Sequence, residues 1–350
     1  MRTFDHIFEK IISVENLISS WQEFRIGKKD RQDALAFERN LEDNIWDLHE
    51  SLISKTYHHL PYSSFFIHDP KIRHIHKASV RDRVLHHAIV KHLNPIFEPT
   101  FIPDSYSCRI NKGSHKGVLK FNQYARKVSR NFTKSCWVLK CDIKKYFASI
   151  DHSMLLAILF RRIQDQDLCW LLKEIVSSFK SEFTTDYNKP KGVPIGNLTS
   201  QLFANVYLNE FDRFMKHELK EKYYIRYADD FTVLHPQRDQ CVSTIEPISC
   251  FLKNHLNLEL SPNKIILRKF SQGIDFLGYV AFPRFSVTRP KTVKRIFRKI
   301  KKKIELVKIG KISWESFHQT LQSYFGVLSH SDSFILKQEL ENQIFFWMTN

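Results

Sequence analysis

The stretch Tyr224-Ile-Arg-Tyr-Ala-Asp-Asp-Phe-Thr-Val-Leu234 places two adjacent carboxylates between two short runs of apolar and aromatic residues. Runs of this composition are typical of β-strands, and the polar residues between them are typical of a tight turn. The segment from Tyr223 to His235 is therefore predicted to form a β-hairpin with Asp229 and Asp230 at its turn. A solvated Asp-Asp turn is the simpler interpretation of this hairpin taken alone.

A second acidic position follows another predicted strand. The apolar run Cys136-Trp-Val-Leu-Lys-Cys-Asp142 ends on a carboxylate, and neighbouring strands of one sheet would bring Asp142, Asp229 and Asp230 together. Three carboxylates can hold two Mg²⁺ ions about 3.5–4 Å apart, an arrangement that serves in-line displacement at phosphorus. We therefore expect these aspartates to be catalytic and to bind two Mg²⁺ ions, for which Mn²⁺ can substitute. A lone Asp at a strand end is otherwise a cap or turn residue.

Five short motifs resemble the palm motifs of the reverse transcriptase family and occur in that family's order. They are, in chain order, Asp142 with Phe147, Asn197 to Gln201, Tyr227-Ala-Asp-Asp230, Leu260-Ser-Pro-Asn-Lys264 and Phe276-Leu-Gly-Tyr279. The third of them resembles the YxDD motif, and the resemblance extends over roughly residues 20 to 345. It implies an RNA-directed DNA polymerase that copies a structured RNA into cDNA from dNTPs and binds the RNA–DNA hybrid.

The resemblance also implies the α+β fold of a right-hand polymerase, with fingers, a palm built on an antiparallel sheet, and a helical thumb. We expect an N-terminal helical extension at 1–60, fingers at 61–135, a palm at 136–282 and a basic helical thumb at 283–350. Residues 151–190 are expected to belong partly to the fingers.

Local patterns predict where the first elements begin and end. Apolar residues recur at helical spacing from residue 4 to about 57, and residues 61–77 have the composition of extended chain. A helix is predicted from about Arg81 to Leu93, ending before Pro95, because proline lacks the N–H that a helix interior requires. A second long helix is predicted from Leu198 to about Leu219.

The last 70 residues are predicted to form a basic helical unit. Thr292 to Lys308 has Ile296, Ile300 and Ile304 on one stripe, surrounded by lysines and arginines. Two more helices are predicted at 313–327 and 332–348, and short strands are predicted at Ile265–Leu267 and Ile274–Val280.

The family resemblance assigns roles to further residues of the site. Phe147 lies five residues after Asp142, where the family has an aromatic side chain that excludes the 2′-hydroxyl of a ribonucleotide; the alternative is an ordinary core aromatic. Ile143, next to Asp142, is counted with the metal ligands. The expected nucleotide-binding residues are Lys71, Arg73, Phe147, Ile195, Gly196, Gln201 and Lys264. The expected template- and primer-binding residues are Arg109, Lys112, Tyr227, Gly278, Arg295, Arg298 and Lys299. The single lysines and arginines of the fingers, and Lys264, can also be read as surface charges.

The central motif departs from the commonest family pattern. Most reverse transcriptases carry Gln-Gly followed by Ser-Pro there, whereas this chain has Ile195-Gly-Asn-Leu-Thr-Ser-Gln201. This form resembles the reverse transcriptases of diversity-generating retroelements, which misincorporate opposite template adenines and work with a small basic accessory protein. The run Gly273-Ile-Asp-Phe-Leu-Gly278 is compatible with the same group. A defence-associated or intron-type reverse transcriptase is the alternative, and a non-catalytic RNA-binding protein is a third possibility.

Composition supports a polyanionic partner. The 350 residues include 54 Lys and Arg against 37 Asp and Glu, for a net charge of +17. A surplus of this size attracts nucleic acid or acidic lipid, although it can also serve solubility alone. The apolar runs are too short to span a bilayer and the N-terminus lacks the pattern of a signal peptide, so we expect a cytoplasmic protein without a membrane partner.

Cysteines and histidines do not predict a metal cage or a disulfide framework. None of the six cysteines forms a CxxC pair, and reduced thiols are the expectation for a cytosolic protein. The histidine pairs at 58–59 and 86–87 have no cysteines at ligand spacing, so a zinc site is not expected there.

Overall fold

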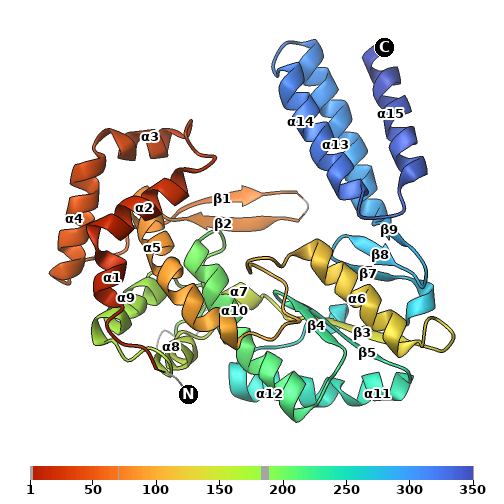
Figure 1. Ribbon diagram of the computed structural model, residues 1–350, viewed down its shortest axis with the longest axis horizontal. Helices are drawn as coiled ribbons and strands as arrows, with labels where there is room; N and C mark the ends of the chain where they lie inside the picture. The colour runs from red at the N-terminus through yellow and green to blue at the C-terminus, as the bar shows by residue number, and fades with distance from the viewer. Residues whose placement is uncertain (1–2, 70, 183–188, 350) are drawn as a thin grey trace.

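The computed structural model describes residues 3–69, 71–182 and 189–349 (Figure 1). It has the α+β class that the sequence predicts. N-terminal helices lie on one side of the molecule, a four-stranded sheet lies beside them, and three C-terminal helices rise from the far end of that sheet.

The palm is built on an antiparallel sheet with the strand order β4-β5-β3-β6. Its strands are β3 (Trp137–Asp142), β4 (Tyr224–Tyr227), β5 (Asp230–His235) and β6 (Ile266–Lys269). Successive residues face opposite sides, so Val138 packs with α6 (Ser114–Val128) while Leu139 belongs to the main core on the other side. The sheet is therefore covered on both faces, as its near-continuous apolar strands require.

Two helices that the sequence analysis did not predict cover the second face of the sheet. They are α11 (Arg238–Ser243) and α12 (Ile245–Leu256). Cys241 from the first and Ile248 and Leu252 from the second are buried in the main core. Short helical turns complete the palm: α7 (Tyr146–Ser149), η3 (Pro262–Lys264) and η4 (Phe270–Gln272).

The fingers combine a β-hairpin with a helical bundle. The hairpin consists of β1 (Ser63–Ile67) and β2 (Arg73–Lys77), and the bundle is centred on α5 (Val80–Phe97). The other helices are α1 (Phe8–Ile12), α2 (Val14–Arg25), α3 (Gln32–Arg39), α4 (Leu41–Ile53), η1 (Glu98–Thr100), α8 (His152–Phe160), α9 (Gln166–Ser177) and α10 (Leu198–Arg213).

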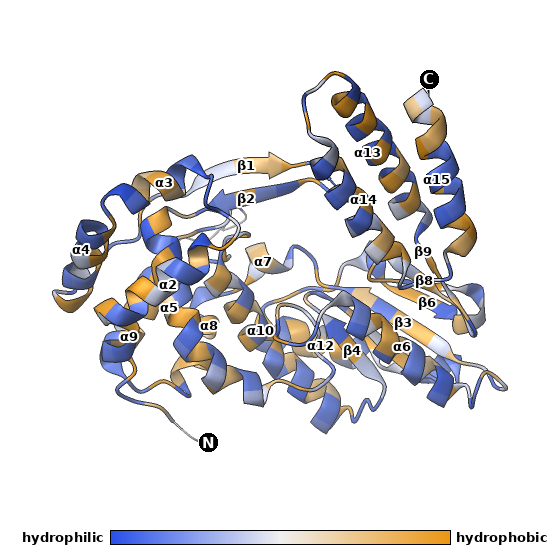
Figure 2. Ribbon diagram, turned by 45° about the horizontal axis from the view of Figure 1, so that its top comes forward, coloured by the Kyte–Doolittle hydropathy of each residue, from blue (hydrophilic) through white to orange (hydrophobic). Residues whose placement is uncertain are grey.

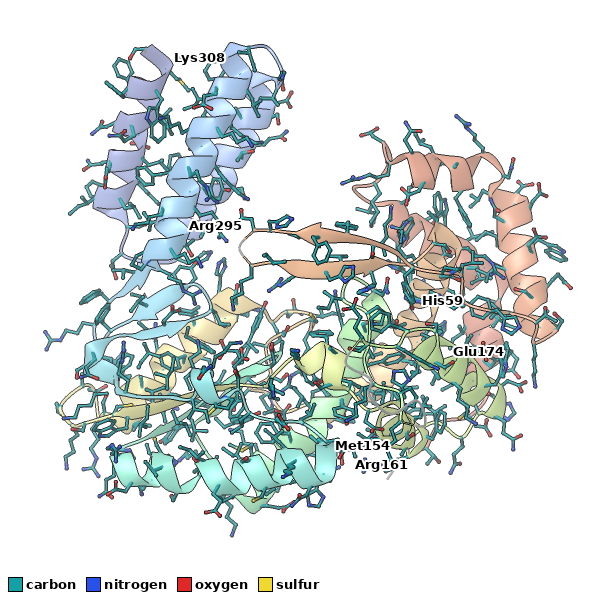
Figure 3. The ribbon with its side chains drawn as sticks, turned by 180° about the vertical axis from the view of Figure 1, so that it is seen from behind. His59, Met154, Arg161, Glu174, Arg295 and Lys308 are labelled. Carbon is teal, nitrogen blue, oxygen red and sulfur yellow. The ribbon has the colours of Figure 1, made fainter. Side chains whose placement is uncertain are left out.

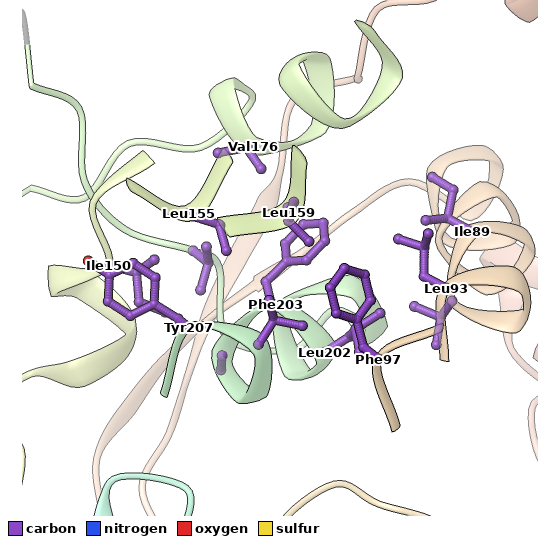
Figure 4. Close-up of a cluster of buried hydrophobic side chains, with 14 of the residues drawn as sticks. Ile89, Leu93, Phe97, Ile150, Leu155, Leu159, Val176, Leu202, Phe203 and Tyr207 are labelled. Atoms are coloured by element: carbon purple, nitrogen blue, oxygen red, sulfur yellow. The ribbon is translucent and has the colours of Figure 1, made fainter. Parts of the chain in front are cut away.

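One apolar core joins the fingers bundle to the palm. Figure 4 shows side chains from four helices in contact with one another. They are Ile89, Leu93 and Phe97 of α5, Leu155 and Leu159 of α8, Val176 of α9, and Leu202, Phe203 and Tyr207 of α10. Helix α8 thus packs with α9 and with α10, which in turn packs with α5. The assignment of 151–190 partly to the fingers stays a prediction, and residues 183–188 of that range lie outside the described residues.

One sequence-based boundary was wrong. Helix α5 continues through Pro95 to Phe97, because a proline in the last turn removes only one backbone hydrogen bond from a helix that is buried along its length. The long helix predicted from Leu198 to about Leu219 is present: α10 ends at Arg213, and a π-helical turn, η2 (Phe214–Glu218), continues it. Helix α6 packs on the palm strands β4 and β5.

The thumb is a three-helix unit attached through a small sheet. The sheet has the order β7-β8-β9 and consists of β7 (Ile274–Phe276), β8 (Tyr279–Ala281) and β9 (Ser286–Thr288). The helices are α13 (Pro290–Lys308), α14 (Trp314–Leu328) and α15 (Phe334–Thr349). Apolar and hydrophilic residues alternate around α13 (Figure 2), and its isoleucines pack with Phe317 and Leu340. No helix among the described residues is long and apolar enough to cross a membrane.

A buried ion pair fastens the palm hairpin to α10. The guanidinium of Arg226 on β4 donates to both carboxylate oxygens of Asp212, at 2.7 and 2.6 Å, and both side chains are fully buried. The same guanidinium donates to the backbone carbonyl of Ala228 at 3.1 Å and to Ser105 Oγ at 3.1 Å. Tyr224 Oη also donates to Asp212, at 2.7 Å. This network therefore supports the turn that holds Asp229 and Asp230.

We expect Asp212→Asn to destabilise the protein by about 3–5 kcal/mol, because the substitution leaves the Arg226 charge buried without its counter-charge. Urea unfolding followed by circular dichroism measures this change. Asp239→Asn is the matched control: that side chain is 96% exposed, so its removal should alter the free energy of unfolding by less than about 0.5 kcal/mol. Similar unfolding midpoints for the two variants would contradict this account.

Candidate active site

The strand register brings the three predicted carboxylates to one edge of the palm sheet. Asp142, the last residue of β3, is the direct partner of Asp230, the first residue of β5, and such partners have Cα atoms about 4.5–5.5 Å apart. Asp229 lies in the adjoining hairpin turn, where its carbonyl accepts a hydrogen bond of 3.1 Å from the Ile143 N–H. Ala228 reaches the turn with φ of 54°. The hairpin thus presents both of its acids beside the end of β3.

Two lysines neutralise part of this acidic cluster. Lys140 Nζ lies 3.1 Å from Asp230 Oδ2, and Lys264 Nζ lies 2.6 Å from Asp142 Oδ1. Sequence reasoning proposed Lys264 but missed Lys140. The period-two alternation of β3 could have found it, because residue 140 lies on the same face of the strand as residue 142.

Burial and mutual repulsion weaken the acidity of the hairpin carboxyls. Burial, with contributions from Asp142 and Asp229, raises the pKa of Asp230 to about 6 even though Lys140 acts in the opposite direction. Burial and the Asp142 charge likewise raise the pKa of Asp229. Asp230 Oδ1 is buried and has no hydrogen-bond partner among the described residues. The site therefore holds more negative charge than its own side chains neutralise.

These carboxylates suit a hard divalent cation by their chemistry. Within residues 3–69, 71–182 and 189–349, no three His, Cys, Asp or Glu side chains are gathered as a ready metal site, and Lys140 and Lys264 each pair with one of the carboxylates. The donors on offer at the end of β3 are all oxygens, which Mg²⁺ prefers. The unpartnered oxygen of Asp230 is an observation of this structure that a bound cation would explain.

The motif that contains Lys264 is fastened to the end of β3. The Ser261 N–H donates to the Asp142 carbonyl at 2.8 Å, and the Lys144 N–H donates to the Glu259 carbonyl at 2.8 Å. Ile143, expected among the metal ligands, has a buried side chain, so only its backbone faces the site. The helical turn at 262–264 places Lys264 so that its Nζ donates to the carboxylate of Asp142.

Phe147 lies in the short helix α7, shortly after Asp142 and Ile143. Its ring is half-buried and packs against the main core, with the Tyr146 ring 5.4 Å away at an interplanar angle of 66°. Tyr146 is anchored by a hydrogen bond to the Ala204 carbonyl. Because its neighbour is anchored, the Phe147 ring is held in place while part of it remains accessible.

The fingers hairpin contributes two exposed cations near the carboxylates. The charge of Lys71 acts on Asp229, where it lowers the pKa against the effect of burial, and Arg73 acts in the same direction on Tyr227. The turn at Ile195 and Gly196 is held to this hairpin, because the His76 N–H donates to the Ile195 carbonyl at 3.1 Å. Gly196 has φ of 120°, and a Cβ there would lie 3.0 Å from Ile75 Cγ2. Gln201 is half-buried at the start of α10.

Arg109 and Lys112 both contact the loop before α6. The Arg109 side chain is 6% exposed and pairs with Glu98 at 2.8 Å, and its guanidinium also donates to the carbonyls of Ile102 and Ser105. Lys112 Nζ donates to the Pro103 carbonyl at 2.7 Å. Both side chains therefore stabilise this loop, and their contact with template stays a prediction.

Two thumb cations contact the tip of the fingers. Lys299 Nζ lies 2.5 Å from Asp69 Oδ2, and Arg295 lies 3.9 Å from the same carboxylate. Figure 3 shows Arg295 next to the end of the β1–β2 hairpin. Arg298 is exposed on the same helix. Fingers and thumb therefore meet on the side of the palm from which the hairpin and α13 project (Figure 1).

The last two predicted residues lie at turns of the palm. Tyr227 is half-buried at the end of β4. Gly278 has φ of 96° in the turn between β7 and β8, and its carbonyl accepts a hydrogen bond of 3.0 Å from the Arg289 N–H. Gly278 thus connects the small sheet to the start of the thumb.

Comparison with known proteins identifies the family of this chain. Residues 67–281 match the family model described as reverse transcriptase (RNA-dependent DNA polymerase). The match covers more than half of the chain and includes the three aspartates. The chain therefore belongs to the reverse transcriptase family.

The chain is also similar in sequence to two bacterial proteins. The chain is 25% identical over 319 residues to the group II intron-encoded protein LtrA of Lactococcus lactis subsp. cremoris, covering 73% of this chain and 51% of that protein. It is 26% identical over 267 residues to protein YkfC of Escherichia coli (strain K12), covering 66% and 69%. The chain thus spans about half the length of the Lactococcus protein.

Among solved structures, the chain is similar to one of telomerase from Candida albicans, in complex with a fragment of telomeric RNA. The TM-score is 0.46 at 13% identity, and the alignment covers 73% of this chain and 53% of that one.

We expect Asp230→Asn to be more stable than the natural sequence at neutral pH when divalent metal is absent. The pKa of Asp230, about 6 in the folded state, exceeds the value of about 3.9 for an unfolded chain. The folded state therefore binds the proton more tightly, and the free energy of unfolding decreases as pH rises from about 4 to about 6. Because asparagine does not titrate, the variant avoids this decrease in the free energy of unfolding, which amounts to about 2–3 kcal/mol.

Urea unfolding in EDTA at pH 4 and at pH 7.5 measures this difference. The stability advantage of the variant should be present at pH 7.5 and absent at pH 4. An advantage of equal size at both pH values would show that the substitution acts through packing.

Proposed function

We propose that this chain is an RNA-directed DNA polymerase that copies an RNA template into cDNA by two-metal-ion nucleotidyl transfer. The observation that carries the proposal is the register of β3 against β5, which sets Asp142 opposite Asp230 with Asp229 in the adjoining turn. In a chain of the reverse transcriptase family, this arrangement is the expected centre of phosphoryl transfer.

Asp142, Asp229, Asp230 and the backbone carbonyl of Ile143 would hold two Mg²⁺ ions, for which Mn²⁺ can substitute. When bound, the ions supply activation of the primer 3′-hydroxyl and charge neutralisation at the transferred phosphorus. If Asp142 served as a metal ligand, the Lys264 ammonium would be free to turn from that carboxylate to the triphosphate. Lys140 keeps the charge of Asp230 partly neutralised throughout.

The remaining predicted residues bind the substrates in this proposal. The incoming dNTP binds to Lys71, Arg73 and the turn at Ile195 and Gly196. Gln201, at the start of α10, belongs to the same nucleotide-binding site. Tyr227, Gly278 and the thumb residues Arg295, Arg298 and Lys299 contact the template, the primer or the RNA–DNA hybrid. For this to occur, the phosphates of the hybrid must replace Asp69 as the partner of Lys299 and Arg295.

Asp229→Asn should reduce primer extension by at least about a thousandfold, because one buried carboxylate ligand of the metal site is lost. Extension of oligo(dT) on poly(rA) with dTTP and Mg²⁺ measures the loss. Binding of the primer–template should remain within a few-fold of normal, since the carboxylate repels rather than attracts nucleic acid. The matched control is Asp239→Asn, which should extend primers normally. Activity retained by Asp229→Asn would remove the basis of the proposed function.

Phe147→Ala should admit ribonucleotides. In the proposed site, the half-buried ring fills the space next to the sugar, and a smaller side chain leaves room for a 2′-hydroxyl. The measurement is the ratio of kcat/KM for dTTP to that for UTP, which should fall by about tenfold or more in the variant. Phe147→Tyr is the control that preserves the ring and should preserve selectivity. Unchanged selectivity in the alanine variant would make Phe147 an ordinary core aromatic.

We further propose that the enzyme belongs with the error-prone polymerases of diversity-generating retroelements. The support is Ile195, which replaces the glutamine of most reverse transcriptases with a side chain that cannot hydrogen-bond a nucleotide. This proposal includes a structured RNA template and a small basic accessory protein. The similarity to the Lactococcus intron-encoded protein favours an intron-type enzyme as the second candidate. No observation specifically favours the other alternative, an antiviral-defence role.

Sequencing of cDNA made in vitro distinguishes the two candidates. For a retroelement enzyme, errors should concentrate at template adenines, and Ile195→Gln should lower their frequency because an amide can again orient the incoming nucleotide. Errors spread evenly over the four template bases would favour the intron-type enzyme.

A further inference from the structure

A groove crosses the molecule on the side away from the thumb. It consists of two adjoining hollows of about 390 and 530 Å³, which share Ile158, Arg161, Glu210, Arg213 and His217. Its walls come from α8, the second half of α10, the π-helical turn η2 and α12. Figure 3 shows Arg161 and Met154, which line it, at the lower edge of the molecule, away from Arg295 and the thumb. The groove is therefore separate from the proposed catalytic cleft.

Arginines dominate the charge of the first hollow. Arg161, Arg162 and Arg213 line it, against one carboxylate, Glu210, which pairs with Arg161 at 3.1 Å. Among the described residues, the guanidinium groups of Arg162 and Arg213 have no ion-pair or hydrogen-bond partner. Guanidinium presents several donors in a planar fork that matches phosphate. Two such forks in one hollow favour an anionic ligand with more than one phosphate.

A stack of aromatic rings forms one wall of the second hollow. The rings of Phe214 and Phe251 lie 4.1 Å apart at an interplanar angle of 14°, and the ring of His255 continues the stack at 4.8 Å and 22°. His255 is exposed at the end of this stack. Flat, partly exposed rings next to basic side chains are the combination that binds single-stranded nucleic acid, with bases stacked on the rings.

The groove also contains a buried acceptor that lacks a donor. Asn209 lines the first hollow and is 7% exposed. Its Nδ2 donates to Thr100 Oγ1 at 3.3 Å, while its Oδ1 has no hydrogen-bond partner in the described part of the chain. A buried acceptor of this kind costs free energy until a donor reaches it. A ribose 2′-hydroxyl is such a donor, and DNA does not have one.

The backbone of this wall is itself unusual. Residues 214–218 form a π-helical turn, closed by a hydrogen bond of 3.0 Å from the Leu219 N–H to the Phe214 carbonyl. Such turns are rare and occur frequently at functional sites. Four residues in or next to this turn line the groove: Arg213, Phe214, His217 and Glu218. The wider turn therefore belongs to the groove wall.

From these observations we infer that the groove is a second binding site for a single-stranded segment of RNA. Phosphates of the segment bind Arg162 and Arg213, a base stacks on His255, and a 2′-hydroxyl donates to Asn209. An acidic peptide would satisfy the arginines but would leave the ring stack and the Asn209 acceptor unused. The site does not take part in catalysis, so the inference stands or falls independently of the proposed polymerase activity.

The test uses the full chain with its catalytic cleft already filled. A dideoxy-terminated primer on an RNA template, with the next dNTP, occupies the cleft at saturation. A fluorescent single-stranded oligoribonucleotide of about ten nucleotides is then titrated, and its anisotropy is followed. Binding is expected under these conditions and should weaken as salt increases.

Three variants define the expected pattern. The double substitution of Arg162→Ala with Arg213→Ala should weaken this binding by about tenfold and reduce the slope of log affinity against log salt by about 1.4, the value for two lost phosphate contacts. His255→Ala should weaken it by about fivefold or more through lost stacking. Arg238→Ala, an exposed arginine on α11, is the matched control and should leave binding unchanged. Primer extension should be normal in every variant, which shows that each one folds.

Several outcomes would overturn the inference. No binding with the cleft filled, or unchanged affinity and salt slope in the double variant, would show that the groove does not bind RNA. Equal affinity for a DNA strand of the same sequence would remove the assignment to RNA through Asn209. Displacement of the RNA by polyglutamate at a lower concentration than by unlabelled RNA would identify an acidic peptide as the ligand instead.

Discussion

The pairing of β3 with β5 determines where the acidic side chains of this protein meet. A slip of one residue in an antiparallel pair turns every side chain of the strand to the opposite face. Here Val138 pairs with Leu234 on the side of α6, and Leu139 pairs with Val233 on the side of the main core. Because both faces of the sheet are buried, neither pair can exchange sides without exposing apolar surface. The hydrophobic alternation of two strands therefore fixes the position of Asp142 opposite Asp230.

That register gathers negative charge at a place where burial makes charge costly. Asp229 and Asp230 have raised pKa values for this reason, and the lysines at 140 and 264 offset only part of the repulsion. The Arg226–Asp212 pair supports the hairpin turn that contains Asp229, because Arg226 donates to the carbonyl of Ala228 in that turn. Stability comes from the core and the buried pair, while the edge that they position is electrostatically unsatisfied. An edge of this kind favours a divalent cation, which is what the proposed chemistry requires.

Features that depend on residues close together in the sequence were predicted well. Features that depend on contacts between distant segments were not. The β4–β5 hairpin, strand β3 and helix α13 were predicted because their patterns are local. The pairing of Arg109 with Glu98 was not predicted, because the two residues belong to different segments and nothing in either segment marks the pair. Helix α6 was not predicted at all, since its assignment to the palm depends on packing against strands far along the chain. The alternation of β3 places Lys140 on the same face as Asp142. Its ion pair with Asp230 becomes evident only from the pairing of β3 with β5.

The contact between fingers and thumb involves cations that the proposed substrate would also bind. Asp69 offers one carboxylate to Lys299 and Arg295, and the side chains of all three are at least a quarter exposed. Ion pairs in such positions contribute little to stability and weaken further with salt. A hybrid duplex offers a continuous row of phosphates and releases its counterions when it binds, so it competes strongly for the same cations. The contact of Asp69 with Lys299 and Arg295 is thus weak, and the phosphates of the proposed substrate are well suited to replace it.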